Sequence, residues 1–155
     1  MISEVYRKGR DAKEASYVLQ TAGTDVKNKA LAYIADALMA HSDAILSANA
    51  EDLKRAKEKG MAPAMVDRLT LTKERISAMA EGVRQVIDLR DPSGIVLDEF
   101  TRPNGLAIKK VSVPLGVIAI IFESRPNVTV DAAALCIKAG NACVLRGGSE
   151  AIASN

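Results

Sequence analysis

Two adjacent glycines that follow an apolar run, in Arg146-Gly147-Gly148-Ser149-Glu150, form the best local candidate for an anion site. Glycines between a strand and a helix expose backbone N–H groups beside a helix N-terminus, and Arg146 adds a positive charge. The spacing matches neither G-x-G-x-x-G nor a P-loop. The alternative interpretation is a tight turn in which Ser149 caps the next helix. The segment therefore predicts a phosphate-binding loop or a simple turn.

A second polar loop, residues 123–127, follows another apolar run, and open α/β sheets bind ligands at the carboxyl ends of their strands. The planar guanidinium of Arg125 can hold a carboxylate or a phosphate. The amide of Asn127 can donate a hydrogen bond to a developing oxyanion. The alternative for Asn127 is a helix cap after Pro126. From the residues alone, both interpretations of Asn127 stay open.

The two cysteines and the single histidine predict neither a nucleophile nor a metal centre. Cys136 falls on the apolar face of an expected helix and Cys143 inside an expected strand, and burial raises the pKa of a thiol. His41 has no second His and no nearby Cys with which to form a metal site or a triad. Two cysteines without C-x-x-C spacing favour a reduced, cytoplasmic protein.

The elements that must position the two loops alternate between strand and helix. Residues 116–122 are apolar on both faces, which is typical of a buried strand in a parallel sheet, and residues 142–145 form a second short strand. The helix between them is expected to end at Gly140 and to place Leu135 against the sheet. Another helix is expected to begin after Gly148. This order predicts the start of a doubly wound α/β sheet.

The preceding residues, 1–93, are helical in pattern. Apolar residues at three- and four-residue spacing from Leu31 onward predict an amphipathic helix with Lys27 on its polar side. A second helix is expected to stop at Gly60, and the charged residues within 48–59 would form its solvated face.

A hairpin is expected between the helices and the sheet, over residues 94–113. Thr72 or Thr70 caps the last helix before it, and Asn-Gly at Asn104 between two β-rich runs is a strong hairpin signal. Residues 114–155 then supply the first β-α-β-α of the sheet. Two parallel strands are not a finished domain, so we expect the chain to be truncated.

Composition excludes several classes of function. With 155 residues, 48% hydrophobic and 26% charged, the chain is an ordinary globular sequence of about one domain. A net charge of +2, 3% aromatic residues and no Trp disfavour nucleic acid as a partner. The longest uncharged run, from Val111 to Phe122, is far shorter than the roughly 20 residues that a membrane helix needs.

Several blocks closely resemble the γ-glutamyl phosphate reductase family of the aldehyde dehydrogenase superfamily. They are Val113-Pro114-Leu115-Gly116, Ser124-Arg125-Pro126-Asn127-Val128-Thr129, the segment 146–150, and Asp67-Arg68-Leu69-Thr70-Leu71-Thr72. The resemblance extends over essentially the whole chain. Because the family's proteins are more than twice as long, the chain resembles their N-terminal portion, without the catalytic domain and its Cys.

The resemblance implies a Rossmann-like cofactor domain and a reaction of proline biosynthesis. This reaction is the NADPH-dependent reduction of L-glutamyl 5-phosphate to L-glutamate 5-semialdehyde, with release of phosphate. In the family, a thiolate displaces phosphate and a hydride reduces the resulting thioester. Since that thiolate has no counterpart here, we expect the 155-residue chain itself to be inactive.

The same resemblance implies a role for each candidate residue. Asn127 would stabilise the oxyanion and Arg125 would bind the substrate. NADP would be held by Arg146, Gly147, Gly148 and Ser149. Ser149 stands where the wider superfamily often has a Glu that repels a 2′-phosphate, which favours NADPH over NADH. Glu150, about 100° further round a helix, need not face the ribose.

The implied partners are the small-molecule substrate, glutamate 5-kinase as a candidate, and further copies of the chain, with the hairpin as a candidate oligomerisation element. No nucleic acid or membrane is implied, and the implied location is the cytoplasm. Two other hypotheses remain. One is a stand-alone, non-enzymatic module for nucleotide binding or assembly, and the other is an aldehyde dehydrogenase-like reductase of a different acyl substrate.

Overall fold

The computed structural model describes residues 3–155, so the first two residues of the expected helical part, 1–93, lie outside the described residues. The described remainder of that part is helical, as predicted. It contains α1 (Glu4–Thr21), α2 (Thr24–Ala40), α3 (Ser42–Glu58), α4 (Pro63–Leu69) and α5 (Lys73–Asp88). No helix within residues 3–155 combines the length and the apolar character needed to cross a membrane.

Local signals set the ends of these helices. α3 stops shortly before Gly60, whose φ of +66° is a conformation that glycine adopts without strain. The hydroxyl of Thr72 accepts a hydrogen bond from the backbone N–H of Arg75 at 3.2 Å and caps α5. Of the two caps considered, Thr72 is therefore the correct one.

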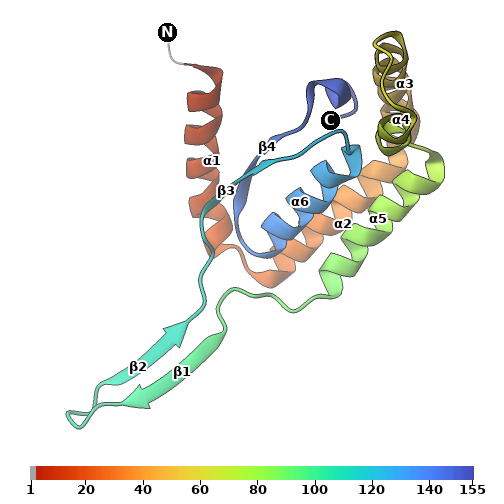
Figure 1. Cartoon of the computed structure of the whole chain (residues 1–155). Coiled ribbons are helices and arrows are strands. Elements are labelled where there is room, and N and C mark those ends of the chain that lie inside the picture. The colour runs from red at the N-terminus through yellow and green to blue at the C-terminus, as the bar shows by residue number, and fades with distance from the viewer. Residues whose placement is uncertain (1–2) are drawn as a thin grey trace.

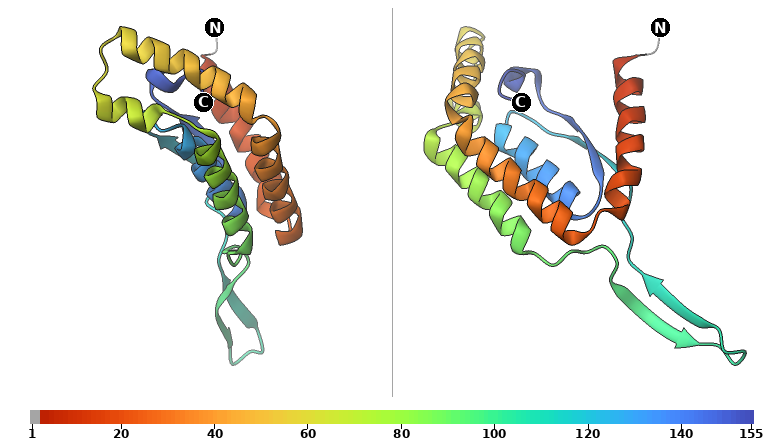
Figure 2. Two further views of the ribbon diagram at one scale, coloured as in Figure 1. Left: turned by 90° about the vertical axis from the view of Figure 1, so that its right-hand side faces the viewer. Right: turned by 180° about the vertical axis from the view of Figure 1, so that it is seen from behind.

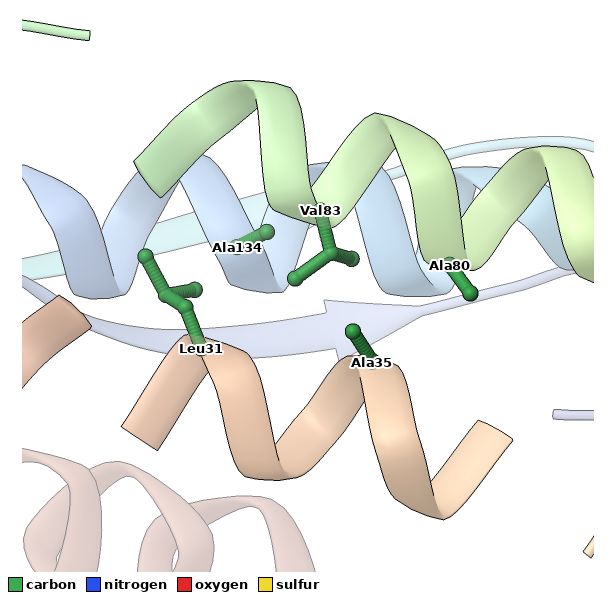
Figure 3. Packing of buried hydrophobic residues seen from close by; sticks show 5 residues of the cluster. All are labelled: Leu31, Ala35, Ala80, Val83 and Ala134. Carbon is green, nitrogen blue, oxygen red and sulfur yellow. The ribbon is translucent and has the colours of Figure 1, made fainter. Parts of the chain in front are cut away.

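The largest apolar core joins α2, α5 and α6 (Pro126–Lys138). Leu31 of α2 packs against small residues on the other two helices (Figure 3). The fully or almost fully buried members are Leu31, Ala35, Ala80, Val83 and Ala134. Small side chains at the contact let the three helices approach closely, so that α6 is held at a fixed position relative to the helical part.

The sheet consists of β3 (Val117–Ile121) and β4 (Ala142–Arg146), which pair in parallel with Ile121 opposite Arg146. α6 connects them and ends at Lys138, shortly before Gly140, which has a φ of +74°. α1 lies on one side of the two strands and α6 on the other (Figures 1 and 2). The predicted fold class, α/β with a parallel β-α-β unit, is confirmed.

Three details of this unit differ from the sequence expectation. Ile121, predicted in a buried strand, is 76% exposed, because no helix within residues 3–155 covers the sheet at the point from which its side chain projects. Leu135 is 53% exposed and lines a groove with Val83 and Val86 of α5 instead of packing on the sheet. The expected final helix is a single 3₁₀ turn, Ser149–Ala151.

The hairpin is formed as expected by β1 (Val96–Thr101) and β2 (Ala107–Val111), which pair antiparallel. Its turn contains Gly105 with a φ of +87°. The hairpin projects away from the helices (Figure 1), and large apolar side chains on it remain exposed, among them Leu97, Phe100 and Leu106.

Lys27, predicted on a polar face, is instead buried and only 3% exposed. Its Nζ lies 2.5 Å from Oδ2 of Asp91, which also accepts a hydrogen bond from the hydroxyl of Thr24 at 2.7 Å. Burial raises the pKa of Asp91, but its hydrogen bonds, first that from Lys27, outweigh this and lower it. The ion pair fixes the start of α2 to the segment that leads into the hairpin.

Asp52, predicted on the solvated face of α3, is completely buried. Its carboxylate accepts hydrogen bonds from the backbone N–H groups of Ala153 (3.2 Å) and Ser154 (2.7 Å), from the Ser154 hydroxyl (2.6 Å) and from Arg55. Burial raises its pKa, but these bonds, led by the Ser154 hydroxyl, lower it overall. Because the amides of Ala153 and Ser154 donate to Asp52 and not to helical carbonyls, the last segment does not continue as a helix.

Candidate functional site

The carboxyl ends of β3 and β4 bring the two predicted loops side by side. The N–H of Phe122 donates to the carbonyl of Arg146 at 3.1 Å, directly where both strands end. Beyond this point, the hydroxyl of Ser124 donates to Oε1 of Glu150 at 2.5 Å. The structure thus joins two segments that are separated by the whole of α6, at the edge where open α/β sheets place their ligands.

The glycine-rich loop presents polar groups to the outside. Arg146 is the last residue of β4 and is exposed, as is Ser149. Gly148, not Ser149, is the N-cap of the 3₁₀ turn, so the interpretation of Ser149 as a helix cap is wrong. A Cβ on Gly147 would collide with the amide of Asn155, and one on Gly148 with the carboxylate of Glu150. Both contacts are with the ends of flexible side chains.

The side chain of Glu150 lies against this loop. Its carboxylate accepts hydrogen bonds from the hydroxyls of Ser124 and, at 3.5 Å, of Ser149. The Ser124 hydroxyl and the backbone amide of Glu150 itself hold the pKa of this carboxyl below its usual value. Residues 149–151 form a 3₁₀ turn, and the Glu150 side chain folds back over Gly148.

The second loop ends where α6 begins. Arg125 is the N-cap residue, Pro126 the first helical residue and Asn127 the second, so the interpretation of Asn127 as a cap is also wrong. The Asn127 amide donates to Oδ2 of Asp131, one turn later, at 3.1 Å. Within residues 3–155 the exposed side chain of Arg125 has no hydrogen bond or ion pair, which leaves its guanidinium available to a ligand.

Asn127 faces a hollow of about 350 Å³ between α6 and the α4–α5 corner. The polar side chains that line it include Arg68, Arg75, Asn127 and Asp131. Sequence reasoning did not assign a role to Arg68 or to Asp131. The only available signal was that Arg68 belongs to the 67–72 block that carries the family resemblance.

The two thiols lie in the packed interior, between α6 and β4. Both are free, and burial together with the neighbouring Cys143 raises the pKa of Cys136 to about 11. Burial also raises the pKa of Cys143. Neither is a thiolate near neutral pH, as the sequence predicts. Within residues 3–155, no three His, Cys, Asp or Glu side chains gather in a way that could hold a metal ion.

These elements define a class: a parallel β-α-β unit with two polar, arginine-bearing loops at the carboxyl ends of its strands, set on a helical layer. No protein-family model matches the chain. Among curated proteins, it is 56% identical over 153 residues to the γ-glutamyl phosphate reductase of Heliobacterium modesticaldum. That match covers 99% of this chain and 37% of the relative.

Solved structures agree with the sequence comparison. The γ-glutamyl phosphate reductase of Thermotoga maritima superimposes with a TM-score of 0.97 at 46% identity, covering 99% of this chain and 37% of that one. The Saccharomyces cerevisiae enzyme gives 0.92 at 37% identity, covering 99% and 39%. The chain spans less than two fifths of the length of these relatives. The resemblance to γ-glutamyl phosphate reductases is confirmed, and it is to their N-terminal portion.

Proposed function

We propose that the chain forms the cofactor-side portion of a reductase that converts L-glutamyl 5-phosphate to L-glutamate 5-semialdehyde in proline biosynthesis. The observation that carries the proposal is a match along 99% of the chain, in sequence and in structure, to proteins named γ-glutamyl phosphate reductase. The paired loops at the strand ends support it, because a phosphorylated substrate and a nucleotide cofactor both require anion-binding groups.

NADP is the proposed cofactor, and its reduced form, NADPH, would supply the hydride when bound. The exposed guanidinium of Arg146 and hydroxyl of Ser149 fit a 2′-phosphate. The hydrogen bond from Ser124 holds the Glu150 carboxylate against the neighbouring loop.

At the substrate end, Asn127 would stabilise the oxyanion that forms on the reacting carbonyl. Its amide carries two N–H donors, of which Asp131 takes one, so the second is free to point toward a ligand. Arg125, at the other side of the start of α6, would bind the phosphate that leaves. The nucleophilic thiolate would come from outside this chain, since Cys136 is buried, Cys143 is half-buried, and burial raises the pKa of both thiols.

We also infer a second copy of the chain as the partner of the hairpin and keep glutamate 5-kinase as a candidate partner. An isolated two-stranded hairpin is marginally stable in water, and the exposed Leu97, Phe100 and Leu106 offer it an apolar surface to bury. The two free thiols support a reducing, cytoplasmic location.

The test is phosphate-dependent oxidation of glutamate 5-semialdehyde by a full-length protein that carries this segment. We expect reduction of NADP that requires inorganic phosphate, and no turnover by the 155-residue chain alone. A full-length protein that binds nucleotide but shows no turnover would support the non-enzymatic module. Turnover of other aldehydes in preference to this one would support a reductase of a different acyl substrate.

A further inference from the structure

Two arginines line the hollow beside Asn127, but only one of them is engaged. Nη1 of Arg75 donates to the carbonyls of Asp67 and Thr70, both at 2.6 Å, and its Nη2 donates to the Asp67 carboxylate at 3.0 Å. Arg75 therefore holds the α4–α5 corner together. The guanidinium of Arg68 has no hydrogen bond or ion pair with any residue in the range 3–155.

An acidic side chain stands on the opposite wall. Asp131 projects from α6 into the same hollow and receives the amide of Asn127 at 3.1 Å. No cation lies within ion-pair distance of Asp131 in the described part of the chain. The hollow thus presents one free cation and one free carboxylate across an opening of about 350 Å³, within the range of small-ligand sites.

A molecule that complements both walls carries a carboxylate and an ammonium group, as when both are attached to one carbon. This is the head of an α-amino acid, and a guanidinium fork and a carboxylate are the side chains that recognise its two charges. A phosphate alone would be repelled by Asp131, and an aliphatic chain alone would leave both charges without partners.

We propose that this hollow binds the amino-acid head of the glutamyl substrate, with Arg68 on its α-carboxylate and Asp131 on its α-ammonium group. The inference deepens the proposed function and rests on it. Asn127 then connects the two ends of the substrate, because one N–H of its amide orients Asp131 and the other is free for the reacting carbonyl. Arg125 is left for the phosphate.

The experiment measures glutamate 5-semialdehyde turnover by a full-length protein, together with competitive inhibition by L-glutamate, by glutarate, which lacks the ammonium group, and by 4-aminobutanoate, which lacks the α-carboxylate. Arg68→Gln should raise KM roughly 10- to 100-fold, the size of a charge-assisted hydrogen bond. It should weaken inhibition by L-glutamate and by glutarate but leave inhibition by 4-aminobutanoate unchanged. Asp131→Asn keeps an acceptor for the Asn127 amide. It should weaken inhibition by L-glutamate and by 4-aminobutanoate but leave inhibition by glutarate unchanged.

Arg84→Gln is the matched control, since Arg84 is an exposed arginine of α5 that pairs with Asp36 outside the hollow. It should leave KM and the three inhibition constants unchanged. The inference is overturned if wild type is active and Arg68→Gln and Asp131→Asn keep the wild-type KM. It is also overturned if each variant weakens inhibition by all three compounds to the same extent. A wild-type protein that does not oxidise glutamate 5-semialdehyde would instead overturn the proposed function.

Discussion

Two regions of the molecule contain charged side chains: the junction between α3 and residues 149–155, and the hollow between α4 and α6. They differ in how many hydrogen-bond partners these side chains have within the chain. At the junction, every oxygen of Asp52 is bonded, and Asn49 donates to the Leu69 carbonyl at 2.8 Å and to the Ser154 hydroxyl at 2.9 Å. In the hollow, Arg68 has no partner within residues 3–155, and Asp131 has one amide.

The difference separates scaffold from site. A buried carboxylate with no hydrogen bonds would cost several kcal/mol, so the junction is stable only because its donors are complete. Exposed charges in an open hollow cost little, and their free donors and acceptors remain available to a ligand. Substitutions at the junction should therefore change stability, whereas substitutions around the hollow and the loops should change activity.

The largest effect is expected for Asn127→Ala in a full-length protein. Loss of one oxyanion donor typically lowers kcat by about 100-fold or more. The melting temperature should change little, because the Asn127 side chain is exposed and its amide donates only to Asp131. Steady-state kinetics and thermal melting on the same preparation check this. A normal kcat, or a kcat that falls only together with the melting temperature, would show that Asn127 has a structural role and does not stabilise the oxyanion.

Asp52→Asn should have the opposite signature, with a loss of about 1–3 kcal/mol of stability. The amide keeps one acceptor oxygen but turns an NH₂ group toward donors on residues 153–154. Because the folded-state pKa of Asp52 is lowered, its contribution is present above the unfolded value of about 3.9 and is lost as pH falls through the folded pKa. Urea unfolding of the 155-residue chain at pH 7 and pH 3 tests this, and the variant should lose less stability on acidification than wild type. An equal loss in both proteins would contradict the assignment.

Arg125→Lys should raise KM for phosphate in the semialdehyde-oxidising direction by about tenfold, because a lysine cannot form the bidentate contact. Since Arg125 has no internal partner within residues 3–155, the melting temperature should not change. Arg90→Lys, another exposed arginine outside both loops, is the control. A wild-type KM for phosphate in Arg125→Lys would remove Arg125 from the site.

Ser149→Glu should give the smallest change, a severalfold shift of kcat/KM from NADPH toward NADH. The new carboxylate would stand beside Glu150 and repel a 2′-phosphate, whereas it would accept hydrogen bonds from the ribose hydroxyls of NADH. Comparing kcat/KM for both cofactors in wild type and variant decides the matter. The cofactor assignment fails if wild type prefers NADH or if the variant keeps the wild-type preference.

Short-range signals predicted most of the fold. The caps at Gly60 and Thr72, the turn before Gly105, and the order of the parallel unit each depend on residues close together in the sequence. The burial of Asp52 could not be predicted in this way, since its partner Ser154 lies 102 positions further along the chain. A helical pattern shows only that a residue lies on the polar side, not which distant segment covers that side.

Only part of the candidate site could likewise be predicted from the sequence. Arg125, Asn127 and the segment 146–149 follow strands, so their position at one edge comes from chain order. Arg68 comes from the helical part and reaches the site only because α5 packs on α6, a contact between surfaces made largely of alanine and valine. Such contacts carry no distinctive sequence pattern.

The Asp52 cluster also imposes an order on folding during synthesis. The ribosome releases α3 long before residues 153–154, so the Asp52 carboxylate remains hydrated while α2 and α5 are already available to pack. The cluster can close only after residues 153–154 have emerged, and it then holds the segment that follows the glycine-rich loop against α3. The position of the loop at the end of β4 therefore depends in part on a residue of α3 that lies 102 positions before Ser154.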